Sequence, residues 1–367
     1  MNGIEPYSGE PDIGRLLAAL RGEKTDRVPH LEILIEDEHV TRLLGRAAGN
    51  TLAVSGEPGK GNAASEGARP MHAADYLELC RIIGQDAIIL EALWTPLKHV
   101  RADGTIGLIT DRSIKGRADF ERIIWPAEAE VEERAQYVRE YVAAAKGTGI
   151  GVALAGFSIF QTLYEFTIGL HDCMILLMED PEFFEELMRR SADYSVKVVE
   201  ASVKAGVDFF YPADDFAFKT GLLVNPKRFR QIWKPHYDRI LAPMREARLP
   251  ILFHSDGKLD AAIEMLVEMG VNGITPMDPS GIDYRDYKKR YGDRLTLHGN
   301  IDITWPLVGG TPADVERDVQ AHMEALKPGG RWIAGSAHSI VNYIPHENFA
   351  AMINAIHRYG SYGGLGT

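Results

Sequence analysis

The sequence contains little cysteine, no long apolar run and no excess of basic residues. Its two cysteines, Cys80 and Cys173, lie far apart in helix-like segments, which supports neither a disulfide framework nor a zinc site built from thiolates. No apolar run is long enough for a membrane helix. The first residues lack a basic segment followed by an apolar one, so no signal peptide is expected and the expected location is the cytoplasm.

The charge balance is acidic and argues against one class of partner. The 367 residues include 40 Lys and Arg against 52 Asp and Glu, a formal net charge of -12, and no cluster of basic residues. Binding to the phosphate backbone of a nucleic acid is therefore not expected. Hydrophobic residues make up 45% of the sequence, which is enough for one large core. We expect a globular protein that binds a small molecule.

Short apolar runs alternate with helix-like segments along most of the chain. The expected strands are 27–34, 86–90, 150–155, 207–211, 250–254, 273–276, 295–299 and 332–334. Such alternation predicts parallel strands joined by crossover helices. No segment resembles a linker, so a single (β/α)8 TIM-type barrel over residues 1–367 is favoured over two Rossmann-like halves. A first helix, 13–21, forms an N-terminal helical extension of this barrel.

One segment, 45–70, departs from this alternation because Gly, Ala, Ser and Asn crowd together in it. This composition predicts a long mobile loop, which is either a lid over the barrel mouth or a surface insertion. The pair Gly59-Lys60 does not indicate a phosphate-binding loop. The spacing to an earlier Gly is wrong, and Gly61 stands where Ser or Thr would bind magnesium.

The apolar run 249–253 ends in an imidazole and a carboxylate, His254 and Asp256. In a parallel α/β fold the carboxyl ends of the strands face the ligand, so these two residues are the first candidates for the site. His338, after the last strand, adds a second imidazole at the same mouth. Together the three side chains can bind zinc, which accepts imidazole nitrogen and carboxylate oxygen and keeps an open position in catalytic sites. The alternative is that each His is an ordinary hydrogen-bonded residue.

Other polar and aromatic residues lie near the expected strand ends. Candidates for catalysis are Asp214, Asp215, Tyr164 and Glu165. Candidates for substrate binding are Phe157, Lys219, Asn300 and Asp302. Each has a structural alternative, because Asp often caps helices and Phe157 is equally suited to the core. The histidines in expected helices, which we interpret as packing or surface residues, include His236, His322 and His357.

At these residues the chain resembles the uroporphyrinogen decarboxylase superfamily, which includes the decarboxylase and the corrinoid-linked methyltransferases that share its barrel. The resemblance covers nearly the whole chain. It is carried by 15–22, 26–29, 86–90, 253–257, 299–302, and His338 followed by Pro345.

The chain departs from the pattern of the decarboxylase itself. The decarboxylase has an arginine-bearing stretch after the first strand that holds substrate carboxylates, whereas 31–38 is acidic here. Its aspartate after the second strand is replaced by Ala92, with Glu91 beside it, although Tyr164 matches a family tyrosine. The resemblance therefore favours the methyltransferase branch.

That branch carries His-x-Cys-Gly at the end of the sixth strand and a later Cys, which bind zinc. His254 matches the His, Asp256 replaces the first Cys and His338 stands where the second is expected. A nitrogen and oxygen ligand set suits an oxygen-bound substrate better than a thiol. The resulting hypothesis is an O-demethylating methyltransferase: zinc polarises a methyl ether oxygen, with aryl ethers as the preferred class. The cobalt of a cobalamin on a separate corrinoid protein accepts the methyl group.

Two further functions stay open at this point. One is a decarboxylase or lyase of the same fold that acts on another carboxylate without metal, with Asp256, Tyr164 and His338 binding the substrate. The other is a non-catalytic barrel that binds a tetrapyrrole or a corrinoid protein. A homodimer would be ordinary for such a barrel.

Overall fold

The structure, a computed structural model, describes residues 3–52, 71–91, 97–100, 103–108 and 112–363. Its parallel strands form two sheets. The first sheet has the order β1 (Ala87–Leu90), β5 (Gly151–Gly156), β6 (Phe209–Pro212). The second has the order β12 (Trp332–Ile333), β11 (Thr296–His298), β10 (Gly273–Thr275), β9 (Leu252–His254).

The two sheets are parts of one barrel. On one side β6 and β9 are joined by isolated parallel bridges, one of them between Ala213 and His254. On the other side the segment 27–35 lies between β12 and β1, through a bridge from His30 to Ala334 and a 3.1 Å hydrogen bond from the Asp86 amide to the His30 carbonyl. The expected strand 27–34 forms only such bridges, because Pro29 within it has no N–H to donate to a ladder. The expected (β/α)8 barrel is confirmed.

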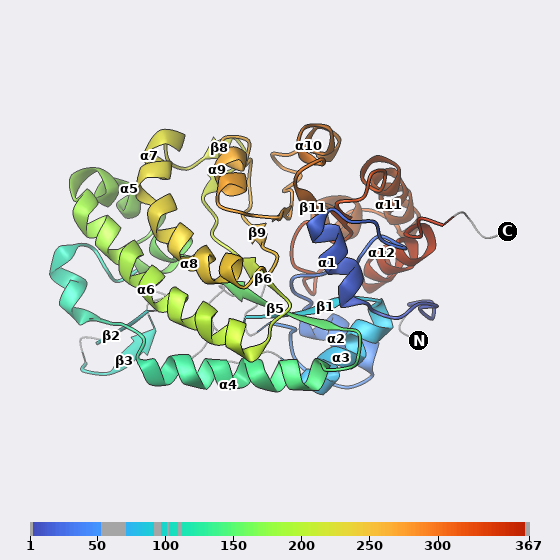
Figure 1. The fold of residues 1–367 in the computed structure, drawn as a ribbon, viewed down its shortest axis with the longest axis horizontal. Helices are drawn as coiled ribbons and strands as arrows, with labels where there is room; N and C mark the ends of the chain where they lie inside the picture. The colour runs from blue at the N-terminus through green and yellow to red at the C-terminus, as the bar shows by residue number, and fades with distance from the viewer. Residues whose placement is uncertain (1–2, 53–70, 92–96, 101–102, 109–111, 364–367) are drawn as a thin grey trace.

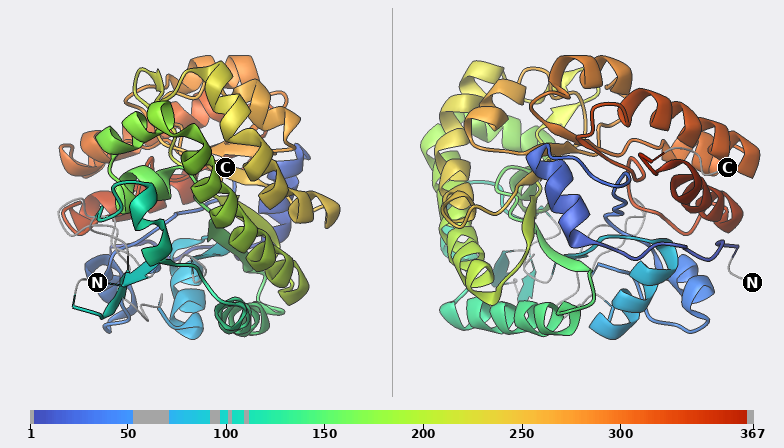
Figure 2. Two further views of the ribbon diagram at one scale, coloured as in Figure 1. Left: turned by 90° about the vertical axis from the view of Figure 1, so that its left-hand side faces the viewer. Right: turned by 45° about the vertical axis from the view of Figure 1, so that its right-hand side comes forward.

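Helices surround the strands (Figures 1 and 2). The α-helices within the described residues are α1 (Ile13–Arg21), α2 (Asp37–Leu44), α3 (Ala73–Ile83), α4 (Glu128–Ala145), α5 (Leu170–Glu179), α6 (Pro181–Ala205), α7 (Pro226–Ile232), α8 (Lys234–Glu246), α9 (Ile263–Glu268), α10 (Tyr284–Tyr291), α11 (Pro312–Leu326) and α12 (His346–Tyr359). Helices α4, α6 and α8 pack side by side along one flank, and α11 packs against α12 on the other (Figure 1). Within the described part of the chain, no helix is both long and apolar enough to cross a membrane.

Side chains along the strands alternate between the barrel interior and the helices. Ala87 and Ile89 of β1 belong to the interior cluster of buried residues, whereas Ile88 and Leu90 pack in the outer cluster. Leu16 of α1 also belongs to the interior cluster, and α1 contacts β11 and β12. The N-terminal helix therefore closes one end of the barrel, as expected of a helical extension.

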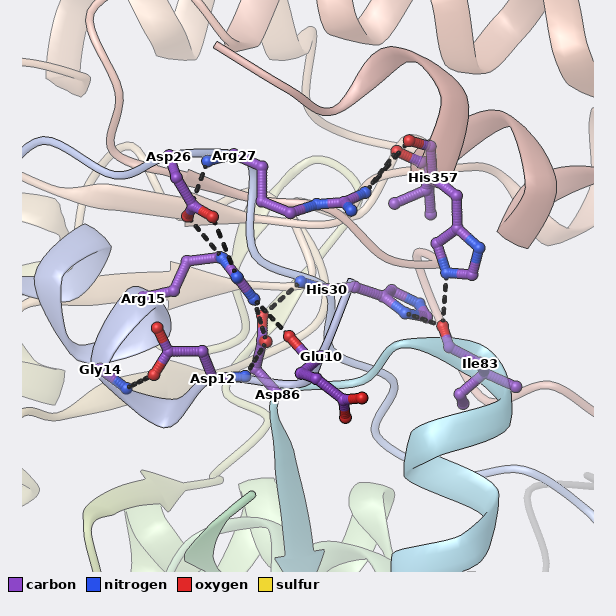
Figure 3. Close-up of polar contacts among 11 residues, drawn as sticks. Glu10, Asp12, Gly14, Arg15, Asp26, Arg27, His30, Ile83, Asp86 and His357 are labelled. Atoms are coloured by element: carbon purple, nitrogen blue, oxygen red, sulfur yellow. Dashed lines mark hydrogen bonds and ion pairs between the residues drawn. The ribbon is translucent and has the colours of Figure 1, made fainter. Parts of the chain in front are cut away.

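A buried ion pair fastens α1 at this end (Figure 3). Arg15 donates to the carboxylate of Asp86, directly before β1, and to that of Asp26, at 2.7 Å in each case. The other oxygen of Asp86 accepts from the His30 amide at 3.1 Å. The family-like segments 15–22, 26–29 and 86–90 therefore meet at the amino ends of the strands, where TIM barrels place stability rather than catalysis.

Several short elements were not expected from the sequence. They are an antiparallel sheet of β3 (Ile106–Leu108), β2 (Lys98–Val100) and β4 (Ile123–Ile124), a hairpin of β7 (Ala217–Phe218) and β8 (Gly221–Leu222), a 3-10 helix η1 (Arg117–Arg122), and a π-helical turn, η2 (Thr162–Thr167). A second π-helical turn, η3 (Ile303–Val308), begins directly after Asp302, in agreement with the structural alternative of a turn capped by this residue. In the expected loop 45–70, residues 45–52 form no helix or strand, and 53–70 lie outside the described residues, as does Ala92. Cys80 and Cys173 are both free, as expected, and both are buried.

Candidate functional site

Three acceptor side chains converge at the carboxyl ends of β6 and β9. One ligand atom from each of Asp215, His254 and Asp256 lies within 4.8 Å of the others, and the described residues contain no second group of this kind. The Nε2 atom of His254 is 3.9 Å from Asp215 Oδ1 and 3.9 Å from Asp256 Oδ1. Two carboxylates and an imidazole at this spacing form a donor set of the kind that binds a divalent cation.

The local electrostatics also favour a cation. Burial raises the pKa of Asp215 to about 7, and the charge of Asp256 adds to this effect. Burial likewise raises the pKa of Asp256 to about 7, with contributions from Asp278 and Glu165. Burial lowers the pKa of His254, against the pull of Asp215. The carboxylates are therefore short of positive charge, which a bound cation would supply.

Neighbouring groups hold the three side chains in place. The Asp256 amide donates to Asp215 Oδ1 at 2.8 Å, and Gln161 Nε2 donates to Asp215 Oδ2 at 2.9 Å. Gln161 Nε2 also lies 2.9 Å from Glu165 Oε2, so one amide joins two carboxylates. Tyr211 Oη lies 3.3 Å from Nδ1 of His254, on the ring edge opposite the acids. Sequence reasoning missed Gln161 and Tyr211, since neither belongs to a recognisable motif.

Asp214 does not belong to this group, and its side chain makes hydrogen bonds to neighbouring segments of the fold instead. Its side chain is fully buried and accepts hydrogen bonds from Ser158 Oγ at 2.8 Å, from the Gln161 amide at 2.7 Å and from Trp233 Nε1 at 2.7 Å, and also from the amides of two residues between 158 and 161. These bonds fix the turn that leads into η2. These contacts agree with the structural alternative for Asp214, and through the turn they also help to place Gln161.

His338 lies near this group but is not one of the three. Burial and the charge of His254 lower its pKa, while Asp278 raises it. Its Nδ1 atom is buried and has no hydrogen-bond partner among the described residues. The structure thus brings together His254 and Asp256 from the set expected on sequence, and adds Asp215 in place of His338.

The aromatic and acidic candidates that follow β5 are Phe157 in the loop and Tyr164 and Glu165 in η2. Burial raises the pKa of Tyr164, and the negative charges of Asp215 and Glu165 add to the shift. The Tyr164 hydroxyl therefore lies within the electrostatic range of the acidic group. Its ring packs edge-on against Phe160, with 5.5 Å between centroids. Phe157 is buried and packs against Phe210, which agrees with its alternative as a core residue.

The remaining substrate-binding candidates make other contacts. Lys219 is exposed and stands over the ring of Phe218, 5.8 Å from its centroid. The buried Asn300 donates to the Met277 carbonyl at 2.6 Å and lies 2.9 Å from Nε2 of His322. Asp302 accepts from the Thr304 amide at 2.7 Å and caps η3. The structure does not bring these three into the group around His254.

The two other histidines expected to pack do so. Nε2 of the buried His236 lies 3.2 Å from Glu185 Oε1. Nε2 of His357 donates to the Ile83 carbonyl at 2.9 Å.

Comparisons with known proteins place this chain in a family. A uroporphyrinogen decarboxylase of Bacillus pumilus is 26% identical over 373 residues, covering 94% of this chain and 95% of that protein. Methylcobamide:CoM methyltransferase MtaA of Methanosarcina barkeri is 26% identical over 198 residues, covering 54% of this chain and 56% of that protein. Among solved structures, a methyltransferase from Methanosarcina mazei has the same fold, with a TM-score of 0.66 and 18% identity over 95% of this chain and 98% of that chain. Residues 60–359 match the family described as Uroporphyrinogen decarboxylase (URO-D), and the chain therefore belongs to that family, while the proteins it is similar to include both decarboxylases and methyltransferases.

Proposed function

We propose that this protein is a methyltransferase that moves a methyl group from a methyl ether, preferably an aryl ether, to the cobalt of a corrinoid carrier protein. The observation that carries the proposal is the group of Asp215, His254 and Asp256 at the barrel mouth, with ligand atoms within 4.8 Å of one another. A single metal ion fits these side chains. The relative named Methylcobamide:CoM methyltransferase takes its methyl group from a methylated corrinoid, so it supports a corrinoid as the methyl-exchange partner, which here stands on the accepting side.

The donor set fits zinc with oxygen chemistry. Imidazole nitrogen and carboxylate oxygen are both zinc ligands, and three protein ligands leave an open position for a substrate. The set contains no thiolate, and the two cysteines, Cys80 and Cys173, are buried in α3 and α5. When bound, zinc would supply a Lewis acid that stabilises negative charge on a leaving oxygen.

The side chains around the metal ligands then have separate tasks. Gln161 orients Asp215, and Tyr211 orients His254. We assign His338 to the substrate side of the site, because it lies outside the group of three, while the charges of His254 and Asp278 act on its ring.

The transfer balances without a further reactant. Cobalt(I) donates an electron pair to the methyl carbon as the carbon–oxygen bond breaks. The bonding pair stays on the oxygen, and cobalt ends in the +3 state. An aryl oxide is the better leaving group because its charge is delocalised, and the site lowers the barrier further by stabilising that charge as it develops.

The acidic mouth disfavours the alternative of a carboxy-lyase. A substrate with several carboxylates would meet Asp215, Asp256, Asp278 and Glu165. Burial, together with the charges of Asp278 and Glu165, already raises the pKa of Asp256. The segment 31–38, where the decarboxylase carries arginine, supplies buried Glu32 and Glu36 instead. A neutral ether would not be repelled by these carboxylates and would not require arginine partners.

The test combines metal content with turnover. Purified protein should contain about one zinc per chain, and chelation should abolish methyl transfer from 2-methoxyphenol to cob(I)alamin, followed by the loss of cob(I)alamin absorbance. His254→Ala should lower both zinc content and turnover, while circular dichroism stays unchanged. Wild-type protein without stoichiometric zinc would refute the proposal. Release of carbon dioxide from a carboxylate substrate by zinc-free protein would establish the carboxy-lyase instead.

A further inference from the structure

Three polar side chains extend from His254 through the barrel interior. Tyr211, Thr275 and His298 come from three different strands, β6, β10 and β11, and all are buried. Thr275 pairs with His254 in the register between β10 and β9. Because side chains of a strand alternate between its two faces, residues at these positions share one layer of the interior.

Four hydrogen bonds connect these side chains in a row, which we call the hydrogen-bond relay. The distances are 3.3 Å from His254 Nδ1 to Tyr211 Oη, 2.9 Å from Tyr211 Oη to Thr275 Oγ1, 2.7 Å from Thr275 Oγ1 to His298 Nδ1, and 2.9 Å from His298 Nε2 to the Leu31 carbonyl oxygen. The relay therefore runs from the metal-ligand candidate to a backbone carbonyl on the far side of the interior.

The carbonyl at the end sets the direction of every bond in the relay. A carbonyl oxygen only accepts, so Nε2 of His298 carries a hydrogen and donates it to Leu31. Burial lowers the pKa of His298 to about 4, so the ring is neutral near pH 7 and its Nδ1 accepts. The single hydroxyl hydrogen of Thr275 must then point to His298.

The remaining two bonds follow from this. Since the Thr275 hydrogen is used, the Thr275 oxygen accepts from the Tyr211 hydroxyl. The Tyr211 hydrogen is then used as well, so the Tyr211 oxygen accepts from His254, and Nδ1 of His254 carries a hydrogen. One arrangement of hydrogens satisfies all four bonds.

We infer that Tyr211, Thr275 and His298 are positioning residues, which hold the proton of His254 on Nδ1 so that the lone pair of Nε2 faces Asp215 and Asp256. The inference rests on the proposed function for the metal that this lone pair would bind. The inferred position of the His254 proton can also be tested in metal-free protein. An isolated neutral histidine side chain prefers its proton on Nε2, so the barrel reverses the intrinsic preference of this ring. Partners that fix the tautomer of a ligating histidine commonly change metal affinity by about 10- to 100-fold.

The first experiment reads the tautomer directly in metal-free protein. The full chain is labelled with nitrogen-15 in histidine, treated with chelator and studied by long-range proton–nitrogen correlation, with His254→Gln identifying the His254 signals. Wild-type His254 should show a protonated Nδ1 and an unprotonated Nε2. In Thr275→Val the Tyr211 hydroxyl loses its acceptor and turns to Nδ1 of His254, so the proton should move to Nε2.

Two variants control for the loss of a side chain. Thr275→Ser keeps a hydroxyl and should retain the wild-type tautomer. Tyr237→Phe removes another fully buried tyrosine hydroxyl, one that has no hydrogen-bond partner among the described residues, and should also leave His254 unchanged. A His254 proton on Nε2 in wild-type protein, or an unaltered tautomer in Thr275→Val, would overturn the inference.

The second experiment measures zinc affinity by competition with a chromophoric chelator. Tyr211→Phe and Thr275→Val should weaken zinc binding by about 10- to 100-fold, whereas Thr275→Ser and Tyr237→Phe should change it little. Equal affinity in all four variants would contradict the positioning role. If the wild-type protein shows the expected tautomers but binds no zinc, the relay stands and the proposed function fails.

Discussion

Two adjacent carboxylates in this barrel have different surroundings because their side chains point in different directions. Asp214 is enclosed by amides, a hydroxyl and an indole N–H, whereas Asp215 lies beside His254 and Asp256. Burial raises the pKa of both, but only for Asp215 does the charge of a second carboxylate, Asp256, add to the shift. Asp214 therefore contributes to the stability of the fold, whereas Asp215 belongs to the candidate site.

Replacement by asparagine should therefore have different effects at Asp214 and at Asp215. Asp214→Asn places an amide group among several donors, and we expect it to lower the free energy of unfolding by about 3 kcal/mol. Asp215→Asn should leave the stability of metal-free protein within about 1 kcal/mol of metal-free wild type but weaken zinc binding by more than about 100-fold, because a ligand is lost. Denaturant unfolding and zinc competition measure the two effects. Similar losses of stability in both variants would contradict this division.

The sequence predicts that His338 is a metal ligand, whereas the geometry places it outside the group of Asp215, His254 and Asp256. We expect His338→Ala to keep about one zinc per chain but to lower methyl transfer by about 100-fold, as for loss of a group that stabilises the leaving oxygen. His236→Gln, on α8 beside Glu185, is a matched histidine control and should retain activity. Loss of zinc from His338→Ala would return His338 to the ligand set expected from sequence.

At the scale of elements, apolar periodicity predicted most of the barrel. Seven of the eight expected strands overlap strands in the structure, and only 27–34 does not form a regular ladder. The hairpin of β7 and β8 and the π-helical turns have no periodic signal, because their geometry depends on tertiary contacts such as those of Asp214.

The site was only partly predictable for the same reason. Strand ends point to His254 and Asp256, because a barrel gathers the carboxyl ends of its strands. The choice between Asp214 and Asp215 depends on how one loop turns. The contribution of Gln161 depends on the turn that Asp214 stabilises, and that turn lacks a sequence pattern. Sequence alone therefore locates the mouth but not the full set of its residues.

His357 of α12 allows a test of how a buried, neutral imidazole affects stability. Burial lowers the pKa of His357 to about 4, while its Nε2 hydrogen bonds to the Ile83 carbonyl (Figure 3). The folded pKa lies below the unfolded value of 6.5, so the unfolded chain takes up the proton first and stability is lost as the pH falls from about 6.5 to 4. His357→Gln keeps a donor but does not titrate in this range.

We therefore expect the stability advantage of wild type over His357→Gln to shrink by up to about 2 kcal/mol between pH 7 and pH 5. Urea unfolding of both proteins at the two pH values measures this difference and cancels the titration of all other groups. An advantage that grows on acidification would mean that the folded ring gains its proton more readily than the unfolded one.

At the scale of the whole molecule, the candidate metal ligands lie where the two sheets meet. Between β6 and β9 the backbone contacts are isolated bridges, whereas β1, β5 and β6 on one side, and β9 to β12 on the other, form regular ladders. Asp215 follows β6, and His254 and Asp256 belong to β9 and its loop. A metal ion held by all three would join the two halves of the barrel at this junction.

Zinc should therefore stabilise the entire fold and not only the mouth. Ligand held by the native state alone raises the free energy of unfolding by about 2.7 kcal/mol at a free concentration about 100 times the dissociation constant. We expect a rise of this size in wild-type protein, its reversal by a chelator and its absence in Asp215→Asn. Since β6 and β9 belong to different sheets, the zinc-dependent increase should protect backbone amides of both sheets from hydrogen exchange. Protection limited to the β9 loop, or an equal increase in Asp215→Asn, would show that zinc binds without joining the sheets.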